Sequence, residues 1–130
     1  MDDNEHALSL LYGVIILTLF GIKNCDTVRK ARKFIEANTL TVSFHDFRQD
    51  GLTREQLEHW TRLIDWSQLL NKRSTSFRAL SEADKTDIDQ QKAIELMLAT
   101  PTLIKRPVLI EQDKILLGFK EADYKAWFNL

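Results

Sequence analysis

The chain has 130 residues and a mass of 15.2 kDa, with 44% hydrophobic and 28% charged side chains and with 4 Gly and 2 Pro. This length allows a sizeable core but excludes a multidomain machine, and the composition excludes disordered and collagen-like proteins. The 18 basic and 19 acidic side chains leave a net charge of -1, so no overall positive field favours nucleic acid. A single cysteine, Cys25, excludes an internal disulfide framework, an iron–sulfur cluster and a multi-cysteine zinc site. We therefore expect no metal and no bound cofactor.

The segment from Ala7 to Ile22 carries no charge and has the apolar character of a membrane or export segment. As a helix it would span roughly 24 Å, which is less than the ~30 Å of a bilayer core, and the residues before it are acidic. The β-branched and aromatic run over 14–20 is instead typical of a buried strand. We expect an N-terminal extension over 1–12, a first strand over 14–20, no membrane association and a cytoplasmic protein.

A helix and a second strand are predicted next. Apolar residues at Val28, Ala31, Phe34 and Ile35 have helical spacing and predict a helix over 26–38. The segment over 41–47 is predicted to be a strand that ends at a turn over 49–51. Because such crossovers are right-handed, the two strands are expected to be parallel neighbours in one sheet.

The next fifty residues change character and predict only helices. Thr53 and Gln56 have the spacing of a capping box, and an apolar stripe follows them. Ser81 is placed to cap a second short helix, and the apolar spacing over 89–99 predicts a third.

Two strands and a helix are predicted at the end of the chain. Apolar runs over 108–110 and 115–117 are separated by a short polar turn, which is hairpin spacing. An amphipathic helix follows over 121–128, and we expect Ala122, Trp127 and Phe128 on its core face.

The order of these elements is the layout of a thioredoxin-like (glutaredoxin-like) α/β fold. We predict a mixed four-stranded sheet with a helical insert between the second and third strands. No linker or repeat divides the chain, so we expect one domain over 13–130, with the insertion at about 52–100.

Cys25 lies where the first strand gives way to the first predicted helix. Unpaired amides and the positive dipole end of a helix N-terminus stabilise a thiolate. Lys23 and Arg29 would add to this effect, whereas Asp26 would oppose it. The neighbours Asn24 and Asp26 are polar, which favours a reactive thiol over a cysteine that only fills space. An inert Cys25 remains the alternative.

Several cysteine chemistries do not fit the neighbouring residues. A phosphatase loop needs an arginine six residues after the cysteine, where Ala31 stands, and a Cys-x-x-Cys redox motif needs a second cysteine where Val28 stands. The three histidines are scattered and have neither metal-ligand spacing nor an evident role as a base. Exchange with an external thiol remains.

A proline immediately precedes the third predicted strand. Pro107 is tolerated at a strand start, and a cis bond there would expose the preceding backbone for pairing with an extended thiol ligand. Lys105 and Arg106 would bring positive charge to Cys25 if the two loops meet. Otherwise they belong to a solvated loop.

Several short motifs, in this order, make the chain resemble the arsenate reductase (ArsC/Spx) family, most closely its YffB branch. They are FGIKNCDT over 20–27, FHDFR with DG over 44–51, LLNKRST over 69–75, IKRP over 104–107 and LGF over 117–119. The resemblance covers about 14–128. It implies a thioredoxin-like domain with a helical insert, a reactive cysteine at Cys25 and an Arg-cis-Pro pair at Arg106 and Pro107.

The function that follows from this resemblance is a glutathione-dependent thiol–disulfide oxidoreductase with Cys25 as its catalytic residue. Glutathione is the expected co-substrate and partner, with an oxidised or glutathionylated protein as a further substrate, and the protein is expected to be a monomer. Candidate residues for binding glutathione or an oxyanion are Lys23, Asn24, Thr27, Arg73, Arg106 and Pro107.

Two alternatives stay open. An arsenate reductase of this family carries two further arginines, and the corresponding positions here look like Asn71 and Gly118, although Arg73 lies two residues from the first. A tetrahedral dianion needs several such donors. A non-catalytic or regulatory protein-binding module of the Spx type is the other alternative, but Val28 stands where Spx-type regulators have their second cysteine.

Overall fold

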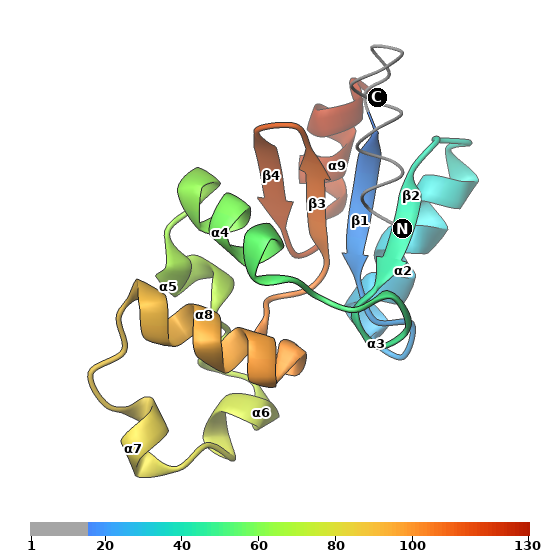
Figure 1. Ribbon diagram of the computed structural model, residues 1–130. Helices are drawn as coiled ribbons and strands as arrows, with labels where there is room; N and C mark the ends of the chain where they lie inside the picture. The colour runs from blue at the N-terminus through green and yellow to red at the C-terminus, as the bar shows by residue number, and fades with distance from the viewer. Residues whose placement is uncertain (1–15) are drawn as a thin grey trace. The chain divides into compact units, whose positions relative to one another are not determined.

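A computed structural model describes residues 16–130 (Figure 1). The expected extension over 1–12 and the first two residues of the expected strand over 14–20 lie outside the described residues. The described residues form two compact units, one of residues 16–50 with Arg106–Leu130 and one of Gly51–Lys105. The expectation of one domain over 13–130 stays a prediction.

The first unit is an α/β sheet structure that confirms the predicted fold class. The strand order is β2-β1-β3-β4, in which β1 is parallel to β2 and antiparallel to β3, and β3 forms a hairpin with β4. Its described elements are β1 (Leu17–Gly21), α2 (Asp26–Ala37), β2 (Ser43–Asp46), α3 (Phe47–Asp50), β3 (Val108–Glu111), β4 (Lys114–Leu117) and α9 (Glu121–Phe128).

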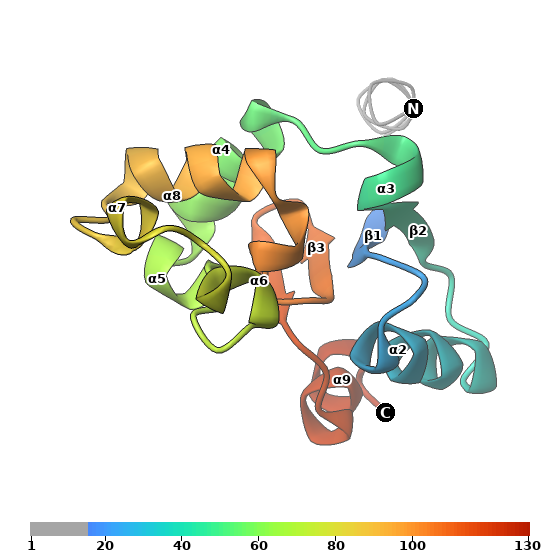
Figure 2. The same cartoon turned by 90° about the horizontal axis from the view of Figure 1, so that it is seen from below.

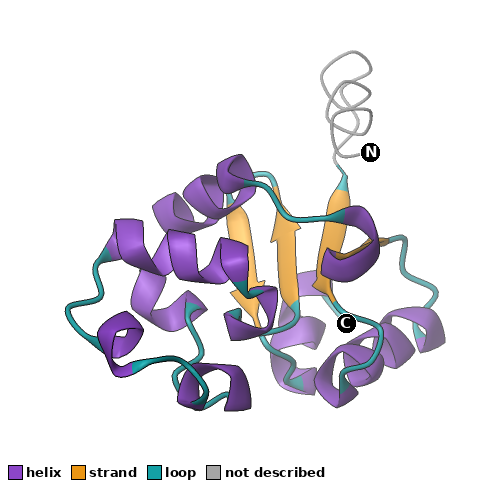
Figure 3. Cartoon of the chain, turned by 60° about the horizontal axis from the view of Figure 1, so that its bottom comes forward, coloured by secondary structure: helices purple, strands orange, loops and turns teal. Residues whose placement is uncertain are grey.

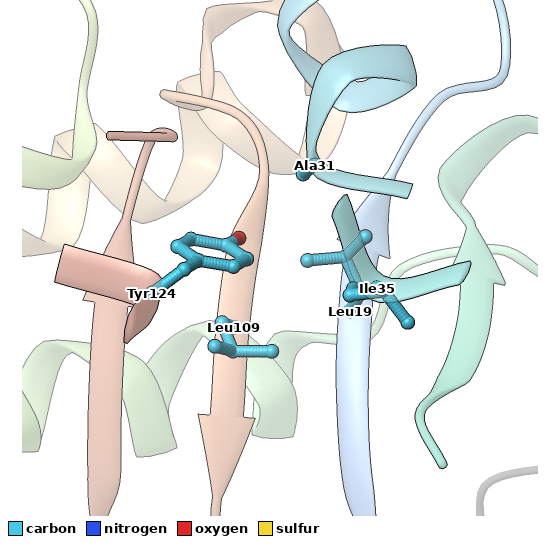
Figure 4. Close-up of a cluster of buried hydrophobic side chains, with 5 residues drawn as sticks. All are labelled: Leu19, Ala31, Ile35, Leu109 and Tyr124. Atoms are coloured by element: carbon cyan, nitrogen blue, oxygen red, sulfur yellow. The ribbon is translucent and has the colours of Figure 1, made fainter. Parts of the chain in front are cut away.

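Helices α2 and α9 cover one face of this sheet, and α3 lies on the opposite side (Figure 2). The core between the sheet and these two helices is built from fully or nearly fully buried side chains (Figure 4). They are Leu19 of β1, Ala31 and Ile35 of α2, Leu109 of β3 and Tyr124 of α9. The apolar spacing of α2 therefore forms the contact that the sequence predicts, and its basic residues stay exposed.

Close packing between β1 and α2 requires a glycine at the end of the strand. A Cβ atom on Gly21 would lie 2.8 Å from Cγ2 and 3.3 Å from Cγ1 of Val28, which is completely buried in the first turn of α2. Because the segment that leads to Cys25 starts at this glycine, the close approach sets where that segment begins.

Two local expectations were wrong. The residues expected to end the second strand and form a turn are instead helix α3, because the Asp46 carboxylate accepts the backbone N–H groups of Arg48 (2.7 Å) and Gln49 (3.3 Å). In α9, Ala122 is exposed and Tyr124 is the buried residue. Position 122 lies two residues before Tyr124 and therefore points to the other side of the helix.

The second unit is helical, as Figure 3 shows by colour, and this agrees with the predicted insert. Its elements are α4 (Arg54–Leu63), α5 (Trp66–Leu69), α6 (Thr75–Arg78), α7 (Glu82–Lys85), α8 (Gln90–Ala99) and the 3-10 turn η1 (Pro101–Leu103). The predicted capping box of Thr53 and Gln56 is present, and Ser81 caps α7. A bridge between Leu70 and Ile104 joins segments distant in sequence within this unit.

No helix in the region 16–130 is long and apolar enough to cross a membrane.

Candidate functional site

Cys25 is the N-cap residue of the twelve-residue helix α2. Its backbone is extended, and its carbonyl accepts the first intrahelical hydrogen bond, from the Arg29 N–H at 2.9 Å. Its side chain makes no capping hydrogen bond, the thiol is free, and the residue is partly exposed. The thiol therefore lies at the electropositive end of α2 and is open to an external reactant.

Arg29 holds the polar residues on both sides of Cys25. Its Nη1 donates to Oδ1 of Asn24 at 3.3 Å, and its Nη2 forms an ion pair with Oδ1 of Asp26. This pair is exposed to solvent, so it adds little to stability. It does compensate the negative charge closest in sequence to the thiol.

The irregular segment between β1 and α2 is tied to the neighbouring strand by Asp46. Oδ2 of this buried carboxylate accepts the backbone N–H of Lys23 at 3.2 Å, while Oδ1 accepts the two N–H groups at the start of α3. Burial acts to raise the pKa of Asp46, but the hydrogen bonds from Arg48, Lys23 and Gln49 and the charge of Lys23 together lower it below 3.8. The carboxylate is therefore ionised at neutral pH.

Sequence reasoning assigned no role to Asp46, although the FHDFR motif contains it. The available signal was its position: a charged residue at the end of a strand parallel to the one that leads to Cys25. In the structure Asp46 is paired with Gly21, the last residue of β1. Side chains at the ends of neighbouring parallel strands meet at one edge of a sheet.

The sheet register brings Arg106 and Pro107 to the same edge. Strand β3 is antiparallel to β1 and Val108 pairs with Phe20, so the residues just before Val108 lie beside those just after Phe20. The Arg106–Pro107 peptide bond is cis, as the family resemblance implies. The Pro107 carbonyl accepts the N–H of Gly118 at 2.9 Å, and Gly118 has the positive φ of 74° that favours glycine.

The Arg106 guanidinium has unused donors. Its Nε and Nη1 are buried and make no hydrogen bond to any residue of the described chain. Unsatisfied buried donors are costly, and a carboxylate or another oxyanion is the partner that a guanidinium accommodates best. Arg106 is thus equipped to bind an anionic group.

The first unit thus gathers most of the predicted site residues. Lys23 and Asn24 are exposed in the segment before Cys25, and Thr27 is partly exposed in the first turn of α2. Arg73 belongs to the second unit, where its N–H donates to Oδ1 of Asn71 and its carbonyl accepts from Arg78. Its role in binding stays a prediction. Within the described residues, no group of three or more His, Cys, Asp and Glu side chains could hold a metal ion.

Comparisons with known proteins agree with this architecture. A solved structure of the YffB protein is 46% identical, covers 85% of this chain and 96% of its own, and has a TM-score of 0.82. The solution structure of an arsenate reductase (ArsC) related protein from Brucella melitensis is 44% identical with a TM-score of 0.71, covering 88% of this chain and 96% of its own.

A protein from Haemophilus influenzae is 42% identical over 113 residues, which is 87% of this chain and 99% of that protein. The model of the ArsC family matches residues 20–127, a range that includes Cys25, the cis proline and the helical unit between them. The chain belongs to the ArsC family.

Proposed function

We propose that the protein is a glutathione-dependent thiol–disulfide oxidoreductase that uses Cys25 as its nucleophile. The observation that carries this proposal is a free, partly exposed thiol at the N-terminus of a long helix, at the same sheet edge as Arg106, a residue with two buried donors that make no hydrogen bond to the described chain. Thiol–disulfide exchange with an anionic thiol such as glutathione requires a thiolate nucleophile and a group that binds the anion.

The reaction has two exchange steps. The Cys25 thiolate attacks the glutathione sulfur of a mixed disulfide, a Cys25–glutathione disulfide forms, and the substrate sulfur leaves as a thiolate that takes a proton from water. A second glutathione thiolate then attacks the glutathione sulfur bound to Cys25, which releases glutathione disulfide and restores the Cys25 thiolate. External glutathione supplies the electrons that a second cysteine would otherwise supply, since position 28 is valine.

Each neighbouring residue has a distinct part in this proposal. Arg106 and Lys23 bind the glutathione carboxylates, and the backbone before Pro107 pairs with the extended peptide. Asn24 and Thr27 line the helix N-terminus beside the thiol. The reducing partner is glutathione, and a glutathionylated protein is the proposed second substrate, with the enzyme acting as a cytoplasmic monomer.

The direct test is reduction of a glutathionylated peptide, with glutathione disulfide production followed through glutathione reductase and NADPH. We expect activity in the native protein and none in Cys25→Ser. Arg106→Gln should raise the KM for the glutathionylated peptide roughly tenfold or more, because it removes charge-assisted hydrogen bonds to a carboxylate.

The matched control is Lys105→Gln, which removes the same charge from the preceding, exposed residue. It should change KM by no more than about twofold. Full activity in Cys25→Ser would overturn the proposal. Equal effects of Arg106→Gln and Lys105→Gln on KM would contradict the proposed role of Arg106 in binding a glutathione carboxylate.

Arsenate reduction is the competing activity, since the family includes arsenate reductases. Gly118 has no side chain to contribute a donor, and its N–H is already bonded to Pro107. We therefore propose disulfide exchange over arsenate reduction. Protection of Cys25 from alkylation by arsenate, and not by glutathione, would reverse this choice.

A further inference from the structure

We propose that Asp46 is a positioning residue that holds the segment carrying Cys25 at the N-terminus of α2. Its carboxylate joins three parts of the chain: the end of β2, the start of α3 and the irregular segment between β1 and α2. This inference rests on the proposed function in one respect, namely that Cys25 is the nucleophile.

The carboxylate is itself firmly held. Asp46 is 4% exposed, and its own N–H donates to Oδ2 of Asp50 at 2.9 Å. Oδ1 is fixed by the two N–H groups of α3, which leaves Oδ2 directed at Lys23. Asp46 also pairs with Gly21 across the parallel strands, so the carboxylate is anchored in the sheet beside the residue from which the Lys23 segment starts. The hydrogen bond from the Lys23 N–H to Asp46 therefore fixes the position of a segment that has no strand or helix structure of its own.

The position of this segment affects the reactivity of Cys25, because a helix N-terminus stabilises a thiolate only when the sulfur stays near the free amides. Cys25 follows Lys23 by two residues, so release of the Lys23 backbone would let the sulfur sample positions away from those amides. The stabilisation of a thiolate by the helix end would then be partly lost, and the reaction of Cys25 with an alkylating reagent would slow.

A purely electrostatic role for Asp46 predicts the opposite sign. Removing a negative charge from the vicinity of a thiol favours its thiolate. The charged groups nearest to Cys25 in sequence, Lys23, Asp26 and Arg29, are unchanged when Asp46 is replaced. The direction of the change in Cys25 reactivity therefore separates positioning from charge.

The variant Asp46→Asn makes this separation. An asparagine oxygen can replace Oδ1 and keep both bonds to α3, but its amide group then faces the Lys23 N–H, donor against donor. The orientation of the new asparagine side chain that keeps the two hydrogen bonds to α3 is thus the orientation that loses the hydrogen bond to the Lys23 N–H. Asp50→Ala is the matched control, because it removes a carboxylate bonded to the same residue but leaves the bond between Asp46 and Lys23 in place.

The measurement is the rate of Cys25 alkylation by iodoacetamide from pH 5 to pH 10, without glutathione. We expect Asp46→Asn to displace the profile to higher pH by at least about half a unit, which lowers the rate about threefold at pH values well below the midpoint of the native profile. Asp50→Ala should match the native protein. An unchanged or faster rate in Asp46→Asn, or an equal loss in Asp50→Ala, would overturn the proposal.

A second pair of variants tests the same bond while Asp46 is intact, and covers the case in which Asp46→Asn does not fold. Lys23→Pro removes both the side chain and the N–H that Asp46 accepts, whereas Lys23→Ala removes only the side chain. Lys23→Pro should be alkylated more slowly at pH 7 than Lys23→Ala, and equal rates would contradict the positioning role. Because alkylation needs no glutathione, a protein without glutathione activity would still give this result.

Discussion

Substitution of Gly21 by alanine tests whether the packing beneath the Cys25 segment is as tight as the structure indicates. The backbone of Gly21 does not have the positive φ that only glycine adopts readily, so the added methyl group is limited by space alone. It would lie 2.8 Å and 3.3 Å from the two methyl groups of Val28. A β-branched side chain in a helix has one favoured rotamer, so rotation cannot move both methyl groups away.

The expected loss of stability follows from the distance by which the new Cβ atom and the Val28 methyl groups must move apart. Ordinary contact requires at least 3.4 Å, so α2 must move by about 0.6 Å or Val28 must be strained. Overpacking of this kind costs about 1–3 kcal/mol, and the lower entropy of unfolded alanine offsets roughly 0.4–1 kcal/mol of that. We expect Gly21→Ala to lower the free energy of unfolding by about 1–2 kcal/mol and Tm by about 3–8 °C.

The assay is urea denaturation followed by circular dichroism, applied to a double-mutant cycle with Val28→Ala. The smaller side chain leaves room for the new methyl group, so the double variant should be more stable than the sum of the single changes by at least about 1 kcal/mol. A Gly21→Ala protein within 0.5 kcal/mol of the native one, or strictly additive effects, would refute the argued contact.

Three further changes have expected outcomes. Tyr124→Phe should raise the free energy of unfolding by about 1 kcal/mol, because the Tyr124 hydroxyl is buried without a partner among the described residues and burial raises its pKa. Thr53→Ala removes the hydroxyl oxygen that accepts the Gln56 N–H at 3.1 Å in the α4 capping box, and should cost about 1 kcal/mol. The lowered pKa of Asp46 stabilises the folded state fully above pH 3.8 and progressively less as the pH falls below 3.8, so Asp46→Asn should flatten the acid branch of the stability curve.

Denaturant titrations measure all three effects. A destabilised Tyr124→Phe protein would mean that the hydroxyl has a partner in solution. Thr53→Ser retains a capping oxygen and should stay within about 0.5 kcal/mol of native, so a loss equal to that of alanine would contradict the capping role. An unchanged slope below pH 3.8 in Asp46→Asn would show that other carboxylates account for acid sensitivity.

Patterns local in sequence were sufficient for most of the fold. The spacing of Val28, Ala31 and Ile35 identified α2 and its buried face, and the Thr53 capping box located the start of α4. Such signals are reliable because the helix period and the cap hydrogen bonds involve residues close together in the chain. The position of Cys25 at a helix N-terminus was predictable for the same reason.

Features that depend on distant residues were harder to predict. The short helix α3 depends on Asp46, whose side chain reads as part of a strand until its hydrogen bonds are known. Tyr124 was missed because its environment includes Phe34 of the distant helix α2, in addition to the nearby Phe119 and Phe128. The unused donors of Arg106 have no sequence signature, and only the family resemblance pointed to its cis peptide bond.

The interior position of β1 and β3 in the sheet has a consequence for dynamics. The segment with Cys25 leaves β1 and the segment with Arg106 enters β3, and each of these strands is hydrogen-bonded on both sides. Local opening of a sheet begins at its edges, here β2 and β4, whereas interior strands exchange their amide hydrogens only in larger openings. The thiol and its neighbouring arginine are thus anchored to the two strands whose amides should exchange most slowly. On heating, the geometry between these two anchors should persist until the sheet itself unfolds.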